Sequence, residues 1–122
     1  MNQANKPENE QPPCTRRDVA LLAQLQEIEL VIEESNILHP ENSERRLESL
    51  RLQRQELRRN LPSAWLERYD KLREQGAPVV KEASGICTGC RLRVPQGDLQ
   101  RMRNGSAPWL CPNCSRFILL SE

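Results

Sequence analysis

The sequence predicts a helical region followed by a small β unit. Apolar residues recur at helical spacing from residue 15 on, and short β-favouring segments replace that pattern from residue 79 on. Four of the five cysteines form two Cys-x-x-Cys pairs within this second part. The predicted fold class is therefore α plus a small zinc-stabilised β unit: an antiparallel, coiled-coil-like helical hairpin followed by a C-terminal four-cysteine zinc ribbon.

Length and composition are consistent with this prediction. A chain of 122 residues with 29% charged residues, a net charge of +1 and only four Trp, Tyr and Phe residues suits exposed helices better than a large core. The N-terminus lacks the apolar stretch of a secretory signal, and no apolar run is long enough to span a membrane. We therefore expect a cytoplasmic protein with no membrane partner. In a reducing cytoplasm, paired cysteines favour metal over disulfides.

Residues 1–14 are polar and contain three prolines, which predicts a disordered tail that includes a free cysteine, Cys14. Thr15 then fits a helix N-cap, with Asp18 three positions later. The helix is predicted to end near Leu38. Its apolar stripe comprises Leu21, Leu25, Ile28 and Ile32, widened by Leu22 and Val31.

A second helix follows a turn at His39-Pro40, with Asn42 or Ser43 as its cap. The short turn predicts antiparallel pairing, with facing positions that sum to about 80. Acids on the first helix then meet arginines on the second: Glu29 lies near Arg51, and Glu33 and Glu34 lie near Arg45 and Arg46. The second stripe comprises Leu47, Leu50, Leu57 and Leu61, and Arg54 interrupts it.

Pro62 predicts a fresh helical start, and Trp65, Leu66, Tyr69 and Leu72 share one face of that helix. This face is either an apolar seam within the fold or a partner-binding surface. The breaker at 76–78 gives three predicted units: a tail over 1–14, a helical hairpin with an extension helix over 15–76, and a zinc ribbon over 77–122.

In the ribbon, short strands are predicted at 79–80, 92–94 and 117–120. Pro95 is placed to begin a turn. Asp98 can cap a single helical turn over 99–103, which Asn104-Gly105 ends.

The predicted metal ligands are Cys87, Cys90, Cys111 and Cys114. The twenty residues between the pairs fall within the four-cysteine zinc spacing. Four thiolates fill the shell of one structural Zn²⁺ and leave no position for water or substrate. An iron–sulfur centre or redox chemistry are the weaker alternatives.

Residues 61–120 resemble the bacterial four-cysteine zinc-ribbon family, in which a coiled-coil helical hairpin precedes a C-terminal zinc ribbon. The resemblance rests on the Leu61-Pro62 start, the Tyr69 helix, the Cys-x-Gly-Cys and Cys-Pro-x-Cys knuckles, the Val94-Pro95 turn and the tail from Arg116. Two features depart from that pattern: Ser115 stands where the family has glycine, and the hairpin is shorter. Better-known members, whose hairpin is longer, are linked to secretion and to chaperoning a sigma factor. The resemblance implies a non-enzymatic interaction protein with a zinc ribbon.

Two functions follow from these observations. The leading one is an adaptor or chaperone-like protein that binds a protein partner through its hairpin, which can also self-associate because two short helices bury their stripes incompletely. The alternative is a nucleic-acid-binding or transcription-associated ribbon, because the region from residue 76 on holds six basic and three acidic residues. Its candidate contacts are Arg91, Arg93, Arg101 and Arg103. No catalytic constellation is present, so we do not expect an enzyme.

Overall fold

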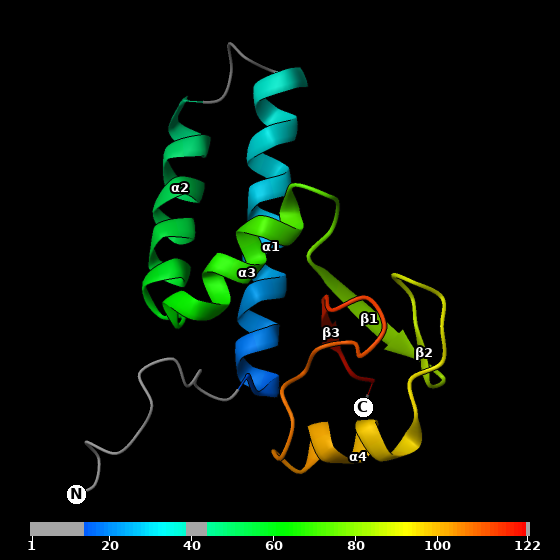
Figure 1. The fold of residues 1–122 in the computed structure, drawn as a ribbon. Helices are drawn as coiled ribbons and strands as arrows, with labels where there is room; N and C mark the ends of the chain where they lie inside the picture. Colours follow the sequence, from blue (N-terminus) through cyan, green and yellow to red (C-terminus); the bar gives the residue numbers. More distant parts are fainter. Residues whose placement is uncertain (1–13, 39–43, 122) are drawn as a thin grey trace, which may run out of the picture.

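The computed structural model describes residues 14–38 and 44–121. α1 (Arg16–Leu38) and α2 (Glu44–Arg59) lie side by side, and α3 (Ser63–Arg73) crosses α1 (Figure 1). β1 (Val79–Ala83), β2 (Ile86–Cys87), α4 (Gln96–Arg103) and β3 (Phe117–Leu119) follow. Helices thus precede a small sheet, as the fold class predicted. The predicted tail over 1–13, the turn at His39 and the caps at Asn42 or Ser43 lie outside the described residues.

The N-terminus of α1 has the predicted cap. The Asp18 carboxylate accepts hydrogen bonds from the backbone N–H of Thr15 at 3.1 Å and from its hydroxyl at 3.3 Å. The Thr15 carbonyl in turn accepts from the N–H of Val19 at 3.1 Å. The acid three positions into the helix reaches back to the cap residue, as the sequence indicated.

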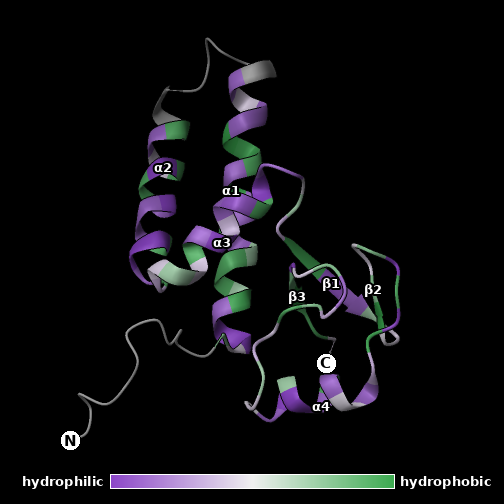
Figure 2. Ribbon diagram, in the orientation of Figure 1, coloured by the Kyte–Doolittle hydropathy of each residue, from purple (hydrophilic) through white to green (hydrophobic). Residues whose placement is uncertain are grey.

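The buried face of α1 differs in part from the predicted stripe. Leu22, Leu25 and Ile32 are buried as expected, but Leu21 and Ile28 are only half-buried and Val31 is exposed. Glu29 takes a place on the buried face instead. Periodicity alone does not fix the centre of a stripe, because α2, α3 and the sheet together decide which side of α1 is covered (Figure 2).

α3 follows the prediction closely. Pro62 is its N-cap in extended conformation, and Trp65 and Tyr69 are its buried residues. Gly76 has φ +148°, a conformation that suits glycine after the helix ends. On α2, Leu47 is buried and Leu50 is half-buried. Coiled-coil packing between α1 and α2 stays a prediction.

The ion pairs of Glu29 differ from the predicted register. Its carboxylate pairs with Arg58 at 3.2 Å and with Arg73 at 3.3 Å, rather than with Arg51, and accepts a 2.6 Å hydrogen bond from the Tyr69 hydroxyl. Glu33 pairs with Arg73 as well. The predicted register paired only α1 with α2. It could not place Tyr69 and Arg73 next to Glu29, because both residues belong to α3. Burial, and then the hydrogen bond to Glu29, raise the pKa of Tyr69.

The sheet has the order β2-β1-β3, with β1 antiparallel to β2 and parallel to β3. The predicted strand at 92–94 is wrong: the structure gives an isolated bridge between Arg93 and Ile86 there. Pro95 is the N-cap of α4 rather than a turn residue, so the helix begins before Asp98. Asn104 is the C-cap of α4, and Gly105 follows with φ +85°, as predicted.

Helices and sheet share one apolar core. Trp65 of α3 packs edge-on against Phe117 of β3, with ring centroids 6.0 Å apart. The Gln26 side chain accepts from the N–H of Val79 at 2.9 Å and donates to its carbonyl at 3.2 Å, which joins α1 to β1. The apolar core therefore continues across the predicted boundary at 76–78.

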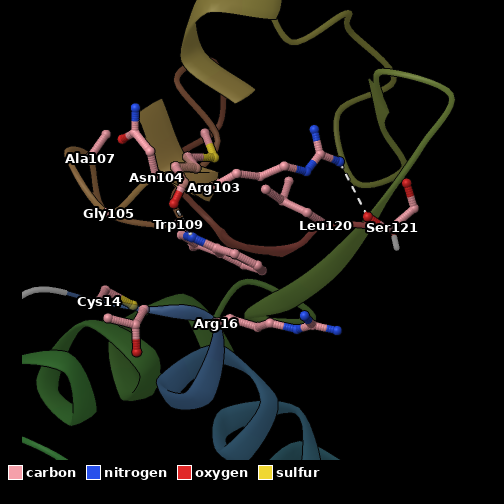
Figure 3. A pocket seen from close by; sticks show the side chains of 11 residues that line it. Cys14, Arg16, Arg103, Asn104, Gly105, Ala107, Trp109, Leu120 and Ser121 are labelled. Carbon is pink, nitrogen blue, oxygen red and sulfur yellow. Dashed lines mark hydrogen bonds between the residues drawn. The ribbon is translucent and has the colours of Figure 1, made fainter. Parts of the chain in front are cut away.

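Cys14 belongs to this core, which corrects its predicted place in a disordered tail. Its side chain is 1% exposed, and its carbonyl accepts a 3.1 Å hydrogen bond from the N–H of Trp109. Figure 3 shows Cys14 facing Trp109 at a pocket of about 540 Å³. Burial raises the pKa of Cys14 to about 12, so its thiol stays protonated at neutral pH.

Candidate metal centre

The two cysteine pairs sit on matching backbone turns. In the first, the N–H of Arg91 donates to the carbonyl of Cys87 at 2.7 Å, and the N–H of Cys87 donates to the carbonyl of Leu92 at 3.0 Å. In the second, the N–H of Ser115 donates to the carbonyl of Cys111, and the N–H of Cys111 donates to the carbonyl of Arg116, both at 2.9 Å. The chain thus repeats one knuckle at both pairs.

The residue that follows each pair has a left-handed backbone. Arg91 has φ +67° and Ser115 has φ +66°. This conformation closes the knuckle, and glycine adopts it at least cost. The structure therefore explains why the family pattern has glycine where this chain has Ser115.

The side chains of the four cysteines converge on one site. Their sulfur atoms all lie within 4.8 Å of one another, and the Cys87–Cys114 and Cys90–Cys111 sulfurs are each 3.8 Å apart. A tetrahedral Zn²⁺ with Zn–S bonds of about 2.3 Å requires sulfur separations of about 3.8 Å. The donors and their spacing fit the metal, so the four cysteines form a C4 site for one structural Zn²⁺, as predicted.

Local N–H groups help to prepare the thiols for the metal. Burial alone raises the pKa of Cys87, but the N–H groups of Cys90 and Gly89 point at its sulfur and bring the pKa below its usual value. The pKa of Cys111 is raised to about 12, mainly by burial, although the N–H of Asn113 donates to its sulfur at 3.4 Å. Zn²⁺ supplies the charge that deprotonates such a thiol when it binds.

Gly89 is favoured in the first knuckle because two side chains pack closely against it. A methyl group at this position would lie 2.9 Å from Cγ1 of Val80 and 2.8 Å from Nη1 of Arg116. Val80 belongs to β1, so this close approach joins the knuckle to the sheet. The guanidinium of Arg116 also lies beside a site whose four thiolates exceed the charge of Zn²⁺.

The four arginines proposed for nucleic-acid binding have different surroundings. Arg91 and Arg93 are exposed. Arg101 pairs with Asp98 within α4. Arg103 donates to the carbonyl of Ser121 at 3.2 Å, as Figure 3 shows, and lies 3.8 Å from the Glu82 carboxylate. Two of the four guanidiniums are thus engaged within the protein.

Sequence reasoning missed the buried acid Glu82. Its carboxylate accepts from the N–H of Gly85 at 2.7 Å and from the N–H and hydroxyl of Ser121 at 2.8 and 2.9 Å. Burial raises the pKa of Glu82, but these hydrogen bonds outweigh it and lower the pKa overall. Glu82 therefore ties the C-terminal end to the turn between β1 and β2. Nothing in the local sequence signals this, because Ser121 is far away along the chain.

Residues 86–118 match the family model of the C4-type zinc ribbon domain, a match that spans both knuckles. Comparison with curated proteins gave no match, and comparison with solved structures gave none either. The chain thus contains a C4-type zinc ribbon domain, which confirms the C-terminal part of the resemblance seen in the sequence. None of the described helices is both long and apolar enough to cross a membrane.

Proposed function

We propose that this protein is a non-enzymatic zinc-ribbon adaptor or chaperone-like protein that binds a protein partner through the α1–α2 hairpin. The observation that carries the proposal is the exposure of large apolar side chains on both helices. Leu52 of α2 is 60% exposed and Val31 of α1 is 37% exposed. When another protein covers such side chains, apolar surface is removed from water, which favours binding.

The shape of the molecule supports the same proposal. α1 and α2 extend together beyond the ribbon, which leaves their far ends away from the sheet (Figure 1). The zinc shell has four protein ligands, so the metal holds the fold and offers no position to a substrate. In this proposal the ribbon is a rigid base and the hairpin is the binding surface.

The test is affinity capture from an extract of the source cell with the immobilised protein. We expect Val31→Asp and Leu52→Asp to reduce the proteins retained, because each places a charge in an apolar contact. Leu92→Asp is the matched control, since Leu92 is 53% exposed but lies in the ribbon. Circular dichroism and zinc content should be unchanged in all three variants. Retention of the same proteins by all variants contradicts the proposal.

If the retained material is instead nucleic acid, and its capture depends on Arg91 and Arg93, the alternative function replaces this one. These two arginines are the exposed members of the predicted set that form no ion pair within the described residues.

A further inference from the structure

A cleft of about 740 Å³ runs along α2, with Glu29 of α1 at one side. We call it the α2 cleft. It is lined by Glu29, Glu48, Arg51, Leu52, Arg54, Gln55 and Arg58. Six of these seven residues belong to α2, so the cleft follows one helix and has a mixed charged and apolar lining.

The carboxylates close to the cleft do not neutralise all of its arginines. Arg58 is held by Glu29 and by Asp70, at 3.2 and 2.7 Å. The Glu29 carboxylate is in turn shared with Tyr69 and Arg73. Arg51 and Arg54, by contrast, form no ion pair with any described residue. Two guanidiniums in the cleft therefore lack a carboxylate partner among the described residues.

Leu52 lies between these arginines in the sequence and lines the same cleft. It is the most exposed of the large apolar side chains that the structure describes, at 60%. A ligand that covers it removes apolar surface from water and brings its own polar groups close to Arg51 and Arg54.

We propose that the α2 cleft binds an acidic segment of a partner protein that also carries apolar side chains. Its carboxylates pair with Arg51 and Arg54, and an apolar side chain covers Leu52. The cleft already holds one carboxylate in this way, because Glu29 accepts from Arg58 at its edge. This inference rests on the proposed function and specifies the chemistry of the partner.

The lining favours a peptide over a nucleic acid. Glu48 repels a phosphate backbone, whereas a peptide can place a neutral or basic side chain opposite it. The exposed Leu52 likewise offers nothing to a phosphate but suits an apolar side chain. Charge complementarity with mixed signs therefore points to a protein segment.

The test uses the full zinc-loaded protein and three fluorescent probes: a peptide of glutamate and leucine, its counterpart with lysine in place of glutamate, and a single-stranded oligodeoxythymidine. We expect the glutamate peptide to bind and the lysine peptide not to bind. Arg51→Glu/Arg54→Glu should weaken binding of the glutamate peptide by about tenfold or more, because two charge-assisted contacts are lost. Arg17→Glu/Arg59→Glu makes the same change in net charge at exposed positions outside the cleft, and should leave binding within about twofold.

Equal weakening by both double variants, or no binding of the glutamate peptide, overturns the proposal. So does oligodeoxythymidine binding that depends on Arg51 and Arg54. Analytical sedimentation tests whether a second copy of this protein occupies the cleft instead. If the protein is a dimer and Arg51→Glu/Arg54→Glu dissociates it, the proposal of an acidic partner segment is overturned. The affinity capture from cell extract separates the two proposals. If Val31→Asp loses the partners and Arg51→Glu/Arg54→Glu retains them, the adaptor function stands and only the acidic-segment inference is refuted.

Discussion

The two zinc knuckles and the helical region satisfy their polar groups over very different distances along the chain. In each knuckle, the carbonyl and N–H of the first cysteine bond to residues four and five positions later. In the helical region, Glu29 is satisfied by Arg58 and Tyr69, which are 29 and 40 positions away. The difference teaches that each knuckle is specified locally, whereas the helices depend on contacts between residues that lie far apart in the sequence.

Among the single substitutions, the largest effect should come from removing the acid that joins the three helices. Glu29→Ala leaves the buried Tyr69 hydroxyl without its acceptor and takes one carboxylate from Arg58 and Arg73, which keep Asp70 and Glu33. The lost charged hydrogen bond and the unsatisfied buried donor together cost about 3 kcal/mol. Glu33→Ala is the control, because its pair with Arg73 is half-exposed and is worth about 1 kcal/mol or less. Denaturant unfolding measures both. Similar losses in the two variants contradict the central role of Glu29.

The Tyr69 hydroxyl gives a pH test of the same network. The folded state raises the pKa of Tyr69, so the neutral form is favoured on folding. The resulting stability is fully present below the ordinary tyrosine pKa of about 10 and is lost as the pH rises above it. Tyr69 is the single tyrosine of the chain, so absorbance at 295 nm reports its ionisation directly.

We expect that ionisation to coincide with unfolding at alkaline pH. Ionisation at the ordinary pKa while the protein stays folded shows that the hydroxyl is not held by Glu29. Tyr69→Phe should weaken the pH dependence of unfolding at alkaline pH, followed by circular dichroism, and should lower the free energy of unfolding at neutral pH by about 1.5–3 kcal/mol, since the lost hydrogen bond has a charged acceptor.

In the ribbon, a single methyl group should have a measurable effect. Gly89→Ala forces contacts below 3 Å with Val80 and Arg116, and overpacking of this kind costs about 1–3 kcal/mol. Gly97→Ala is the matched control, because its methyl group meets only the end of the Arg101 side chain at 3.4 Å, within α4. Alanine has a higher helix propensity than glycine, but Gly97 lies in the first turn of α4, so this variant should gain less than the roughly 1 kcal/mol of a helix interior. Thermal unfolding of the zinc-loaded proteins distinguishes the two, and equal shifts contradict the packing account.

The smallest effect should be a gain at the second knuckle. Ser115→Gly relieves a left-handed backbone at φ +66° and should stabilise the protein by about 1 kcal/mol, with zinc binding retained. Ser115→Val should destabilise it, because a β-branched residue tolerates this conformation least. A loss of stability in the glycine variant shows that the Ser115 side chain makes a contact that outweighs the strain.

The residues that could be predicted are those whose partners lie nearby in the sequence. The four ligands, the Thr15–Asp18 cap and the end of α4 all depend on spacings of a few residues. Glu29 is predicted to lie near Arg51, and both line the α2 cleft. Its ion pairs with Arg58 and Arg73 differ from the prediction, because a two-helix register contains no information about α3. Cys14 was placed in the tail by composition, although Trp109 anchors it from the other end of the chain. The strand at 92–94 was predicted from β-favouring residues, but its pairing reduces to a single bridge.

Zinc should stabilise the helices as well as the ribbon, because Gln26, Trp65 and Cys14 join the helices to the sheet and to the segment before the second knuckle. Hydrogen exchange of the amides of Leu22 and Leu25 in α1, measured with zinc and after its chelation, tests this most directly. Structural zinc contributes an apparent 10–16 kcal/mol or so in small domains, comparable to the whole stability of a protein this size. We therefore predict that exchange in α1 accelerates together with exchange in β1 and β3. Loss of protection in the strands with unchanged protection at Leu22 and Leu25 contradicts the claim.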